Sequence, residues 1–138
     1  MTLNLTPTAR QATSLAGLCD GAVHLPGDPG YDAARMPWNV ALDQRPAAVA
    51  LPRSVSDVQD VVRAAAAAGL RVAPQSTGHN AGPLVAHDLG DVVLLRTERM
   101  RGVTIDPTRR IARVEGGALW IDATEPAAEA VPGDADVG

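Results

Sequence analysis

The sequence contains no lysine and no phenylalanine, and its only aromatic residues are two tryptophans and one tyrosine. Without lysine, the chain can carry neither the lysine of a Walker-type phosphate loop nor a Schiff-base lysine. Apolar residues still make up 46% of the chain, although large aromatic anchors are missing. The hydrophobic core must therefore be built from valine, leucine and alanine.

Excess positive charge and long apolar runs are also missing. The formal net charge is -4 at pH 7 and no basic run occurs, so we expect no nucleic-acid partner. No apolar stretch approaches the roughly 18 residues of a membrane span, and the N-terminus lacks the charge and apolar run of a signal peptide. These absences predict a cytoplasmic protein without a membrane partner. Alanine and arginine richness without lysine is typical of a GC-rich genome, which predicts a bacterial origin.

Cysteine and histidine are too few to suggest a disulfide or a metal centre. The single cysteine, Cys19, cannot form an internal disulfide, and we expect it to be a small buried hydrophobic residue. A metal site would have to combine His79 with His87 and Asp88. A glycine and a proline lie between them, so no helix holds the three on one face. We therefore predict no metal site.

The middle of the chain has the pattern of a β-α-β unit. Residues 47–52 form a short apolar run, residues 54–70 have helical periodicity, and residues 71–74 form the next apolar run. Ser56 and Gln59 have the spacing of a capping box at the start of this helix. The two strands are expected to be parallel, because a helical crossover joins them. Valines at several positions are expected to share the buried helix face: Val55, Val58, Val61 and Val62, together with Ala65.

The flanking segments are less regular. Residues 8–19 predict an N-terminal helix, and the proline- and glycine-rich residues 24–39 predict an extended arm that docks onto another surface. Farther along, the sequence predicts a central strand, a hairpin and a helix that Pro126 either kinks or begins. These three elements correspond to residues 91–97, to strands within 103–106 and 110–117, and to residues 118–131.

The most informative segment follows the second strand of the β-α-β unit. Residues 76–80, Ser-Thr-Gly-His-Asn, offer consecutive backbone N–H groups, and Gly78 has no Cβ to block a ligand. Such N–H groups form an anion-binding concavity that suits a pyrophosphate. Gly78 and Gly82 do not have the spacing of a dinucleotide fingerprint. The alternative interpretation is a glycine-rich turn that binds nothing.

Several motifs follow one another in a fixed order along the chain. They are PGDPGYDAARMPWN, RPAAVALPRSVSDVQDVVRAAAAAGLRVAP, STGHNAG, ERMRGVTIDPTRRIARVEGGALW and a terminal DVG. In this order they resemble the N-terminal part of bacterial FAD-linked oxidases related to berberine bridge enzyme. These oxidases belong to the flavoprotein superfamily of vanillyl-alcohol oxidase and p-cresol methylhydroxylase (PCMH). The resemblance begins near Leu25 and covers most of the chain.

The resemblance implies an α+β fold, an incomplete PCMH-type FAD-binding domain. In this interpretation residues 1–44 form an N-terminal helix and extended arm, and residues 45–138 form part of the domain. The first subdomain covers residues 45–102 approximately and contains a β-α-β unit with a small mixed sheet. Residues 103–138 approximately form the start of the second subdomain, a hairpin followed by a helix.

The same resemblance implies the cofactor and its site. FAD is the expected cofactor, with its pyrophosphate held by the loop from Pro74 to Gly82 and its isoalloxazine linked through the 8α-methyl group to His79. Residues 75–77 are Gln-Ser-Thr where Arg-Ser/Gly-Gly is frequent in the family, so backbone donors carry most of the expected phosphate binding. The predicted cofactor-binding residues are Pro74, Gln75, Ser76, Thr77, Gly78, His79, Asn80, Gly82, Val137 and Gly138.

The implied activity is that of a flavin-dependent oxidase. FAD would take a hydride from a C–H bond beside a hydroxyl or amine of a small-molecule substrate, and O₂ would reoxidise it. No residue of this chain is predicted to be catalytic, and the family's substrate domain is expected to be missing, which predicts a truncated chain. The alternative function is that of a non-catalytic fragment or a small binding module.

Overall fold

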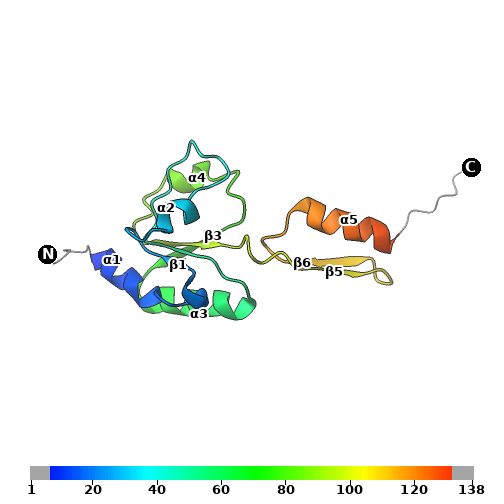
Figure 1. Ribbon diagram of the computed structural model, residues 1–138, viewed down its shortest axis with the longest axis horizontal. Coiled ribbons are helices and arrows are strands. Elements are labelled where there is room, and N and C mark those ends of the chain that lie inside the picture. The colour runs from blue at the N-terminus through cyan, green and yellow to red at the C-terminus, as the bar shows by residue number, and fades with distance from the viewer. Residues whose placement is uncertain (1–6, 132–138) are drawn as a thin grey trace, which may run out of the picture.

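The computed structural model describes residues 7–131 and divides them into two units (Figure 1). The first is a four-stranded mixed sheet with helices on both faces, and the second is a hairpin with one helix beside it. The predicted α+β fold is therefore confirmed. In chain order the elements are α1 (Pro7–Ala12), η1 (Thr13–Leu15), η2 (Cys19–Gly21), β1 (Val23–His24), α2 (Tyr31–Ala34), β2 (Ala48–Ala50), α3 (Val55–Ala67), β3 (Arg71–Gln75), α4 (Gly82–Val85), β4 (Val92–Arg96), β5 (Val103–Asp106), β6 (Ile111–Val114) and α5 (Trp120–Ala130).

The four-stranded sheet has the order β1-β2-β4-β3. Strands β2 and β3 both pair with β4 in parallel, and β1 pairs with β2 antiparallel. The predicted β-α-β unit is present, but β4 lies between its two strands. All five residues of β4 are buried, as expected for the central strand of a covered sheet. The carboxyl ends of β2, β3 and β4 consequently meet at one edge.

Each face of this sheet has its own apolar cluster. Helices α1 and α3 lie on one side of the sheet, and α2 and α4 lie on the other (Figure 1). Ala48 and Ala50 of β2 pack with Val61 of α3, whereas Val49 packs with Tyr31 on the opposite face. Alternation along the strand thus fills two small cores made almost entirely of Val, Leu and Ala. Cys19 is buried as predicted, and this burial raises the pKa of its thiol to about 11.

The start of α3 differs from the sequence prediction. The N-cap is Ser54, whose Oγ accepts a hydrogen bond from the Asp57 N–H at 3.1 Å, and Asp57 in turn accepts one from the Arg53 N–H. The predicted box at Ser56 and Gln59 was therefore two residues too late. It failed because the extended backbone required of an N-cap occurs at Ser54.

The buried stripe of α3 is also narrower than predicted. Val61 and Ala65 are fully buried, but Val55 and Val62 are 58% and 44% exposed. Residues 61 and 65 are one helical turn apart, whereas residue 62 is rotated by about 100° from residue 61. Only the part of the helix that faces the sheet is covered.

The N-terminal helix is shorter than the predicted 8–19. Helix α1 ends at Ala12, and a single 3₁₀ turn follows to Leu15. The hydroxyls of Thr13 and Ser14 donate to carbonyls three residues back, at 2.5 and 2.8 Å. Such bonds compete with the α-helical pattern. Positive φ angles at Gly17 and Cys19 then reverse the chain before β1.

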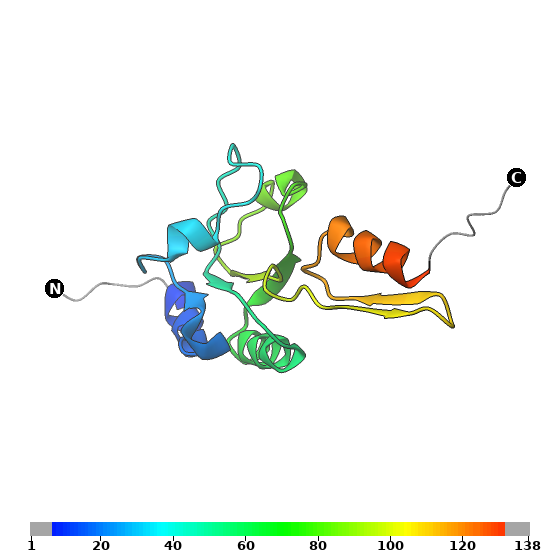
Figure 2. The ribbon, with the colours of Figure 1, turned by 45° about the vertical axis from the view of Figure 1, so that its right-hand side comes forward.

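The second unit extends away from the first (Figure 2). Strands β5 and β6 form the predicted hairpin, and α5 lies along it. Pro126 stands inside α5, so the predicted alternative of a shorter helix that begins at this proline is wrong. The helix starts earlier because the Asp122 carboxylate accepts the Leu119 N–H at 2.7 Å. Across residues 7–131, no helix combines the length and apolarity needed to cross a bilayer.

Candidate functional site

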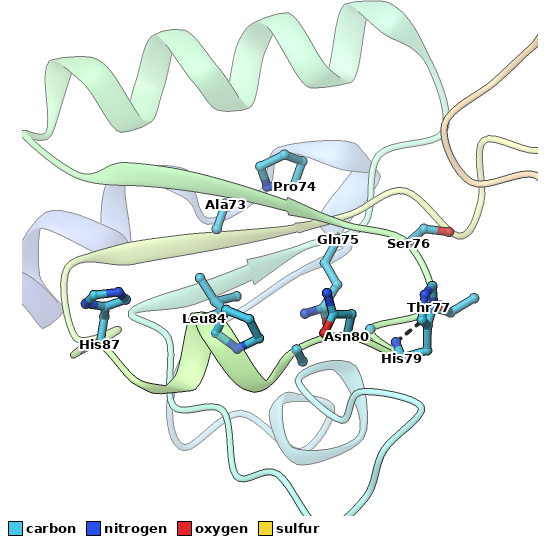
Figure 3. Close-up of a pocket in the computed structure, with 12 residues that line it drawn as sticks. Ala73, Pro74, Gln75, Ser76, Thr77, His79, Asn80, Leu84 and His87 are labelled. Atoms are coloured by element: carbon cyan, nitrogen blue, oxygen red, sulfur yellow. Dashed lines mark hydrogen bonds between the residues drawn. The ribbon is translucent and has the colours of Figure 1, made fainter.

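A cavity of about 580 Å³ lies at the carboxyl end of β3 (Figure 3). The end of the strand, the loop of residues 76–81 and helix α4 form its lining. His79 and His87 stand at opposite ends of it (Figure 3). Ligands commonly bind at this edge of sheets that contain parallel strands. The structure thus brings the predicted loop residues together around one hollow.

The loop presents backbone donors that nothing in the described part of the chain uses. No hydrogen bond within residues 7–131 engages the N–H groups of Ser76, Thr77, Gly78 or Asn80. The His79 N–H makes a long bond of 3.3 Å to the Thr77 Oγ1. A run of free N–H groups carries partial positive charge and is suited to phosphate oxygens. The loop therefore fits the anionic part of a dinucleotide cofactor without any lysine.

Gly78 is required by the loop's own packing. Its φ is +74°, and a Cβ there would lie 2.8 Å from the Pro37 Cβ and 2.9 Å from the Gln75 Oε1. The sequence argument attributed this glycine to ligand approach, but the contacts that exclude a side chain come from the protein itself. Gly82 is different, because a Cβ there would meet nothing within 4 Å.

A buried pair of side-chain amides, Gln44 and Gln75, holds the start of the loop. The side chains of Gln75 and Gln44 exchange two hydrogen bonds, of 3.1 and 2.7 Å, and Gln44 also donates to the Arg35 carbonyl. Gln44 is fully buried and Gln75 is 9% exposed. Gln75 stands where the family often has arginine, and its amide is used to fasten the loop to the N-terminal arm. Sequence reasoning missed Gln44, because a single polar residue before a strand carries no signal of a partner 31 residues away.

The N-terminal arm of residues 24–39 docks beside this loop, but it is not extended throughout as predicted, because α2 forms at Tyr31–Ala34. The Trp38 N–H donates to the Thr77 carbonyl at 2.8 Å. Arg96, at the end of β4, donates through Nη1 to the Ala34 and Met36 carbonyls at 3.1 and 2.7 Å. These contacts hold the arm against the carboxyl edge of the sheet.

Arg96 is also a buried cation. Its side chain is 7% exposed, Nη2 pairs with Glu98 at 2.7 Å, and Nε has no hydrogen-bond partner among the described residues. The guanidinium is therefore ion-paired within the protein and retains one buried donor that no described residue uses. The sequence pattern gave no indication of this, because Arg96 closes an apolar strand.

The arm is anchored farther back by Tyr31 and Arg35. The Tyr31 hydroxyl donates to the Pro46 carbonyl at 2.6 Å, and burial raises the pKa of this tyrosine. Arg35 pairs with Asp32 and Asp43, while Arg45 also donates to Asp43. Hydrogen bonds from Arg45 and then Arg35 lower the pKa of Asp43. The arm therefore has charged as well as backbone anchors.

A second, smaller cavity adjoins the first. Its volume is about 290 Å³, and Ser76 and Thr77 line both cavities. Trp38 from the arm and Arg101 and Leu119 from the start of the second unit complete part of its wall. Arg101 forms a bidentate pair with Asp122, and hydrogen bonds from Arg101 and then the Leu119 N–H lower the pKa of Asp122. An extended ligand that crosses the 76–77 backbone would meet both hollows.

His79 is held by a neighbour two residues away. Its Nδ1 lies 2.8 Å from the Thr77 Oγ1, the contact drawn as a dashed line in Figure 3. The imidazole is otherwise exposed in the cavity. A neutral imidazole nitrogen in this setting can act as a nucleophile toward an electrophilic carbon.

The remaining predicted residues are distributed as follows. Pro74 is in β3 and exposed, Asn80 is exposed in the loop, and Gly82 begins α4. Val137 and Gly138 lie outside the described residues. In residues 7–131 no group of three or more histidine, cysteine or acidic side chains could hold a metal ion.

This arrangement, a mixed sheet with a donor-rich loop at its carboxyl edge, defines a cofactor-binding α+β domain. The sequence profile described as the FAD binding domain matches residues 46–131, and the chain belongs to this family. It is 34% identical over 122 residues to (R)-6-hydroxynicotine oxidase of Paenarthrobacter nicotinovorans, covering 88% of this chain and 26% of that protein. It is 35% identical over 82 residues to xylooligosaccharide oxidase of Thermothelomyces thermophilus, covering 59% of this chain and 16% of that protein.

Solved structures have the same fold. The crystal structure of 6-hydroxy-D-nicotine oxidase from Arthrobacter nicotinovorans superposes with a TM-score of 0.66 and 31% identity, over 78% of this chain and 23% of that one. The grass pollen allergen Phl p 4 superposes with a TM-score of 0.71 at 21% identity, over 80% of this chain and 24% of that one, and shows the fold alone. The chain spans about a quarter or less of the length of these relatives.

Proposed function

We propose that this chain is the FAD-binding part of a flavin-dependent oxidase in which the loop of residues 75–80 holds the FAD pyrophosphate and His79 forms a covalent bond to the flavin. In the intact protein, the flavin would oxidise a C–H bond beside a hydroxyl or amine of a small organic substrate, with O₂ as the final acceptor. The relatives named as hydroxynicotine and xylooligosaccharide oxidases support this reaction class.

One observation carries the proposal: four free N–H groups stand beside an exposed imidazole, at the sheet edge where a ligand would bind. Phosphate oxygens would accept from Ser76, Thr77 and Gly78, and the cofactor would extend from there toward His79.

In this proposal the cofactor carries out the redox chemistry, and the residues of the chain bind and orient it. FAD, when bound, supplies the hydride acceptor. The chain's residues would hold its anionic part through backbone donors, fix the loop through the Gln44–Gln75 pair, and place the His79 imidazole at the cavity wall. Substrate specificity would reside in parts of the relatives that this chain does not cover. We infer a small polar substrate from the names of the relatives alone.

The test uses acid denaturation of the full protein followed by gel electrophoresis. Flavin fluorescence should migrate with the wild-type polypeptide and disappear in His79→Ala, because only that side chain would carry the bond. His87→Ala is the matched control, since His87 lines the same cavity and should keep its fluorescence. Fluorescence that persists in His79→Ala would refute the attachment site.

The same preparation tests the phosphate loop. In a His79→Ala background, where no covalent bond would form, Gly78→Val should displace the loop from Pro37 and Gln75 and weaken FAD binding by about 2 kcal/mol through lost charge-assisted hydrogen bonds. Gly82→Ala in the same background is the control, because its Cβ meets no atom within 4 Å. Equal FAD affinity with and without Gly78→Val would remove the loop from the cofactor site.

A further inference from the structure

We propose that Gln44 is a positioning residue for the cofactor: by holding Gln75 it keeps the free N–H groups of residues 76–78 in the arrangement that binds phosphate, and it couples FAD binding to docking of the N-terminal arm. This inference rests on the pyrophosphate binding proposed above and adds a residue that lies outside the loop. It does not depend on a covalent bond to the flavin.

The amide of Gln44 has every polar group engaged. Its Nε2 donates to the Arg35 carbonyl at 2.9 Å and to the Gln75 Oε1 at 3.1 Å, and its Oε1 accepts from the Gln75 Nε2 at 2.7 Å. The side chain is fully buried, so any rotation would leave these groups without a partner and without water. Gln44 therefore joins the arm, at Arg35, to the residue that ends β3.

Gln75 transmits this constraint to the loop. Its Oε1 and Cδ lie 2.9 and 3.0 Å from the point that a Cβ of Gly78 would occupy, so the Gln75 amide is packed against the backbone of residue 78. The Cβ of Pro37, in the arm, lies 2.8 Å from the same point. The left-handed backbone of Gly78, with a φ of +74°, is thus held between the arm and an amide that Gln44 orients.

The hydrogen bonds between the loop and the rest of the protein have one polarity. The carbonyls of residues 75, 77 and 78 all accept from backbone N–H groups of the protein. The donor to residue 77 is the arm residue Trp38, at 2.8 Å. The N–H groups of residues 76–78 have no such partner within residues 7–131. The protein therefore fixes the loop through its acceptors and leaves its donors to an anionic ligand.

Docking of the arm and binding of FAD are coupled for this reason. A loop that the arm has already ordered loses less conformational entropy when a ligand binds. By reciprocity, a ligand that needs this arrangement stabilises the docked arm by the same factor. Gln44 lines neither of the two cavities, so it can be changed without altering the surface that the ligand would contact.

The first test measures FAD affinity in the full, flavin-free protein carrying His79→Ala, which excludes a covalent bond. Gln44→Met keeps the length of the side chain but removes the amide, and should weaken FAD binding about tenfold, the equivalent of one charge-assisted hydrogen bond. Gln75→Met should have the same effect, and combining the two should add little, because Gln44 acts through Gln75. Tyr31→Phe is the matched control. It removes another buried hydrogen bond of the arm, to the Pro46 carbonyl at 2.6 Å, and should leave FAD affinity unchanged.

The outcomes separate this inference from the proposed function. Backbone ¹⁵N shifts of residues 76–78 should change in Gln44→Met and not in Tyr31→Phe, which is a readout independent of flavin. Undiminished FAD affinity in Gln44→Met, or an equal loss in Tyr31→Phe, would overturn the positioning role while leaving the phosphate loop in place. Absence of FAD binding both with and without His79→Ala would overturn the proposed function as well.

The second test follows hydrogen exchange of the Trp38 amide, which donates to the Thr77 carbonyl. Saturating FAD should slow this exchange by about fivefold or more in the His79→Ala protein. The slowing should be smaller when Gln44→Met is added, at equal occupancy by FAD. Exchange at residue 38 that FAD does not alter would refute the coupling between the arm and the cofactor.

Discussion

The four-stranded unit and the hairpin unit differ in how their strands are covered. Every residue of β4 is buried, whereas every residue of β6 is exposed. Helices cover both faces of the first sheet, and α5 alone lies along the second, with Ala123 as its only buried residue. The two sequences accord with this difference, because β4 is apolar at four consecutive residues before Arg96, whereas β6 carries the charged Arg113 between Ala112 and Val114. A strand with elements packed on both faces is thus continuously apolar, and a strand with a single helix beside it is not.

The difference matters because the candidate site belongs mainly to the buried unit. The loop of residues 76–81 follows β3 directly and rests on the Gln44–Gln75 pair within that unit. The hairpin unit reaches it only at the second cavity, through Arg101, Gly117 and Leu119. The first unit therefore supplies most of the site, and the second unit contributes part of the wall of the second cavity.

The largest expected effect comes from truncating equivalent apolar side chains in the two units. Leu94→Ala in β4 should lower the free energy of unfolding by about 3 kcal/mol, because Leu94 is fully buried and a cavity would remain. Ile111→Ala in β6 should cost less than about 1 kcal/mol, since Ile111 is 51% exposed. Urea unfolding of both variants measures the contrast. Equal losses would show that β6 is covered by residues beyond those described.

An intermediate loss of stability is expected at Gly117, which lies where the two units meet. A Cβ at Gly117 would lie 1.7 Å from the Thr97 carbonyl oxygen and 2.7 Å from that of Met100, and backbone atoms cannot rotate away. Gly117→Ala should therefore cost about 2 kcal/mol and speed hydrogen exchange of the residue 117 amide, which donates to Met100. Gly116→Ala, with nothing within 4 Å, is the control and should be near neutral. Unchanged exchange at residue 117 would mean that this contact does not hold the units together.

The smallest effect is a change with pH at the start of α5. The pKa of Asp122 is lowered, so its bonds to Arg101 and Leu119 are complete above the ordinary aspartate pKa of about 3.9 and are lost as the pH falls through the lower folded value. The Leu119 amide should therefore lose exchange protection only in that acid range. Arg101→Gln should raise the pKa of Asp122 and move the loss to higher pH. Carboxyl ¹³C titration of Asp122 measures both, and identical titration in Arg101→Gln would contradict the assigned cause.

Local signals in the sequence predicted much of the first unit. The apolar runs at 47–52 and 91–97 were recognisable because strands covered on both faces are continuously apolar. The insertion of β4 between β2 and β3 could not be predicted, because strand order depends on packing between distant segments. The end of α1 and the start of α3 were misplaced because side-chain hydroxyls determine them. Thr13 and Ser14 donate hydrogen bonds after α1, and Ser54 accepts one at the start of α3.

For the candidate site, the sequence predicted the loop but not its support. Consecutive small polar residues after a strand indicated free N–H groups, and the structure leaves those of Ser76, Thr77, Gly78 and Asn80 unpaired within residues 7–131. The Gln44–Gln75 pair and the burial of Arg96 could not be predicted, since their partners come from distant parts of the chain. The steric requirement for glycine at residue 78 could not be predicted either, because Pro37 contacts this position only when the arm is docked.

The exposure of both tryptophans gives the molecule an unusual optical property. Trp38 is 76% exposed and Trp120 is 85% exposed, so their indoles are already surrounded by solvent in the folded state. Their emission consequently changes little when the chain unfolds. Trp38, however, borders the hollow that Ser76 and Thr77 share with the larger cavity. A flavin bound there would accept excitation energy from Trp38 and quench its emission. The tryptophan fluorescence of this chain would therefore report whether a flavin is bound at the loop, and not whether the chain is folded.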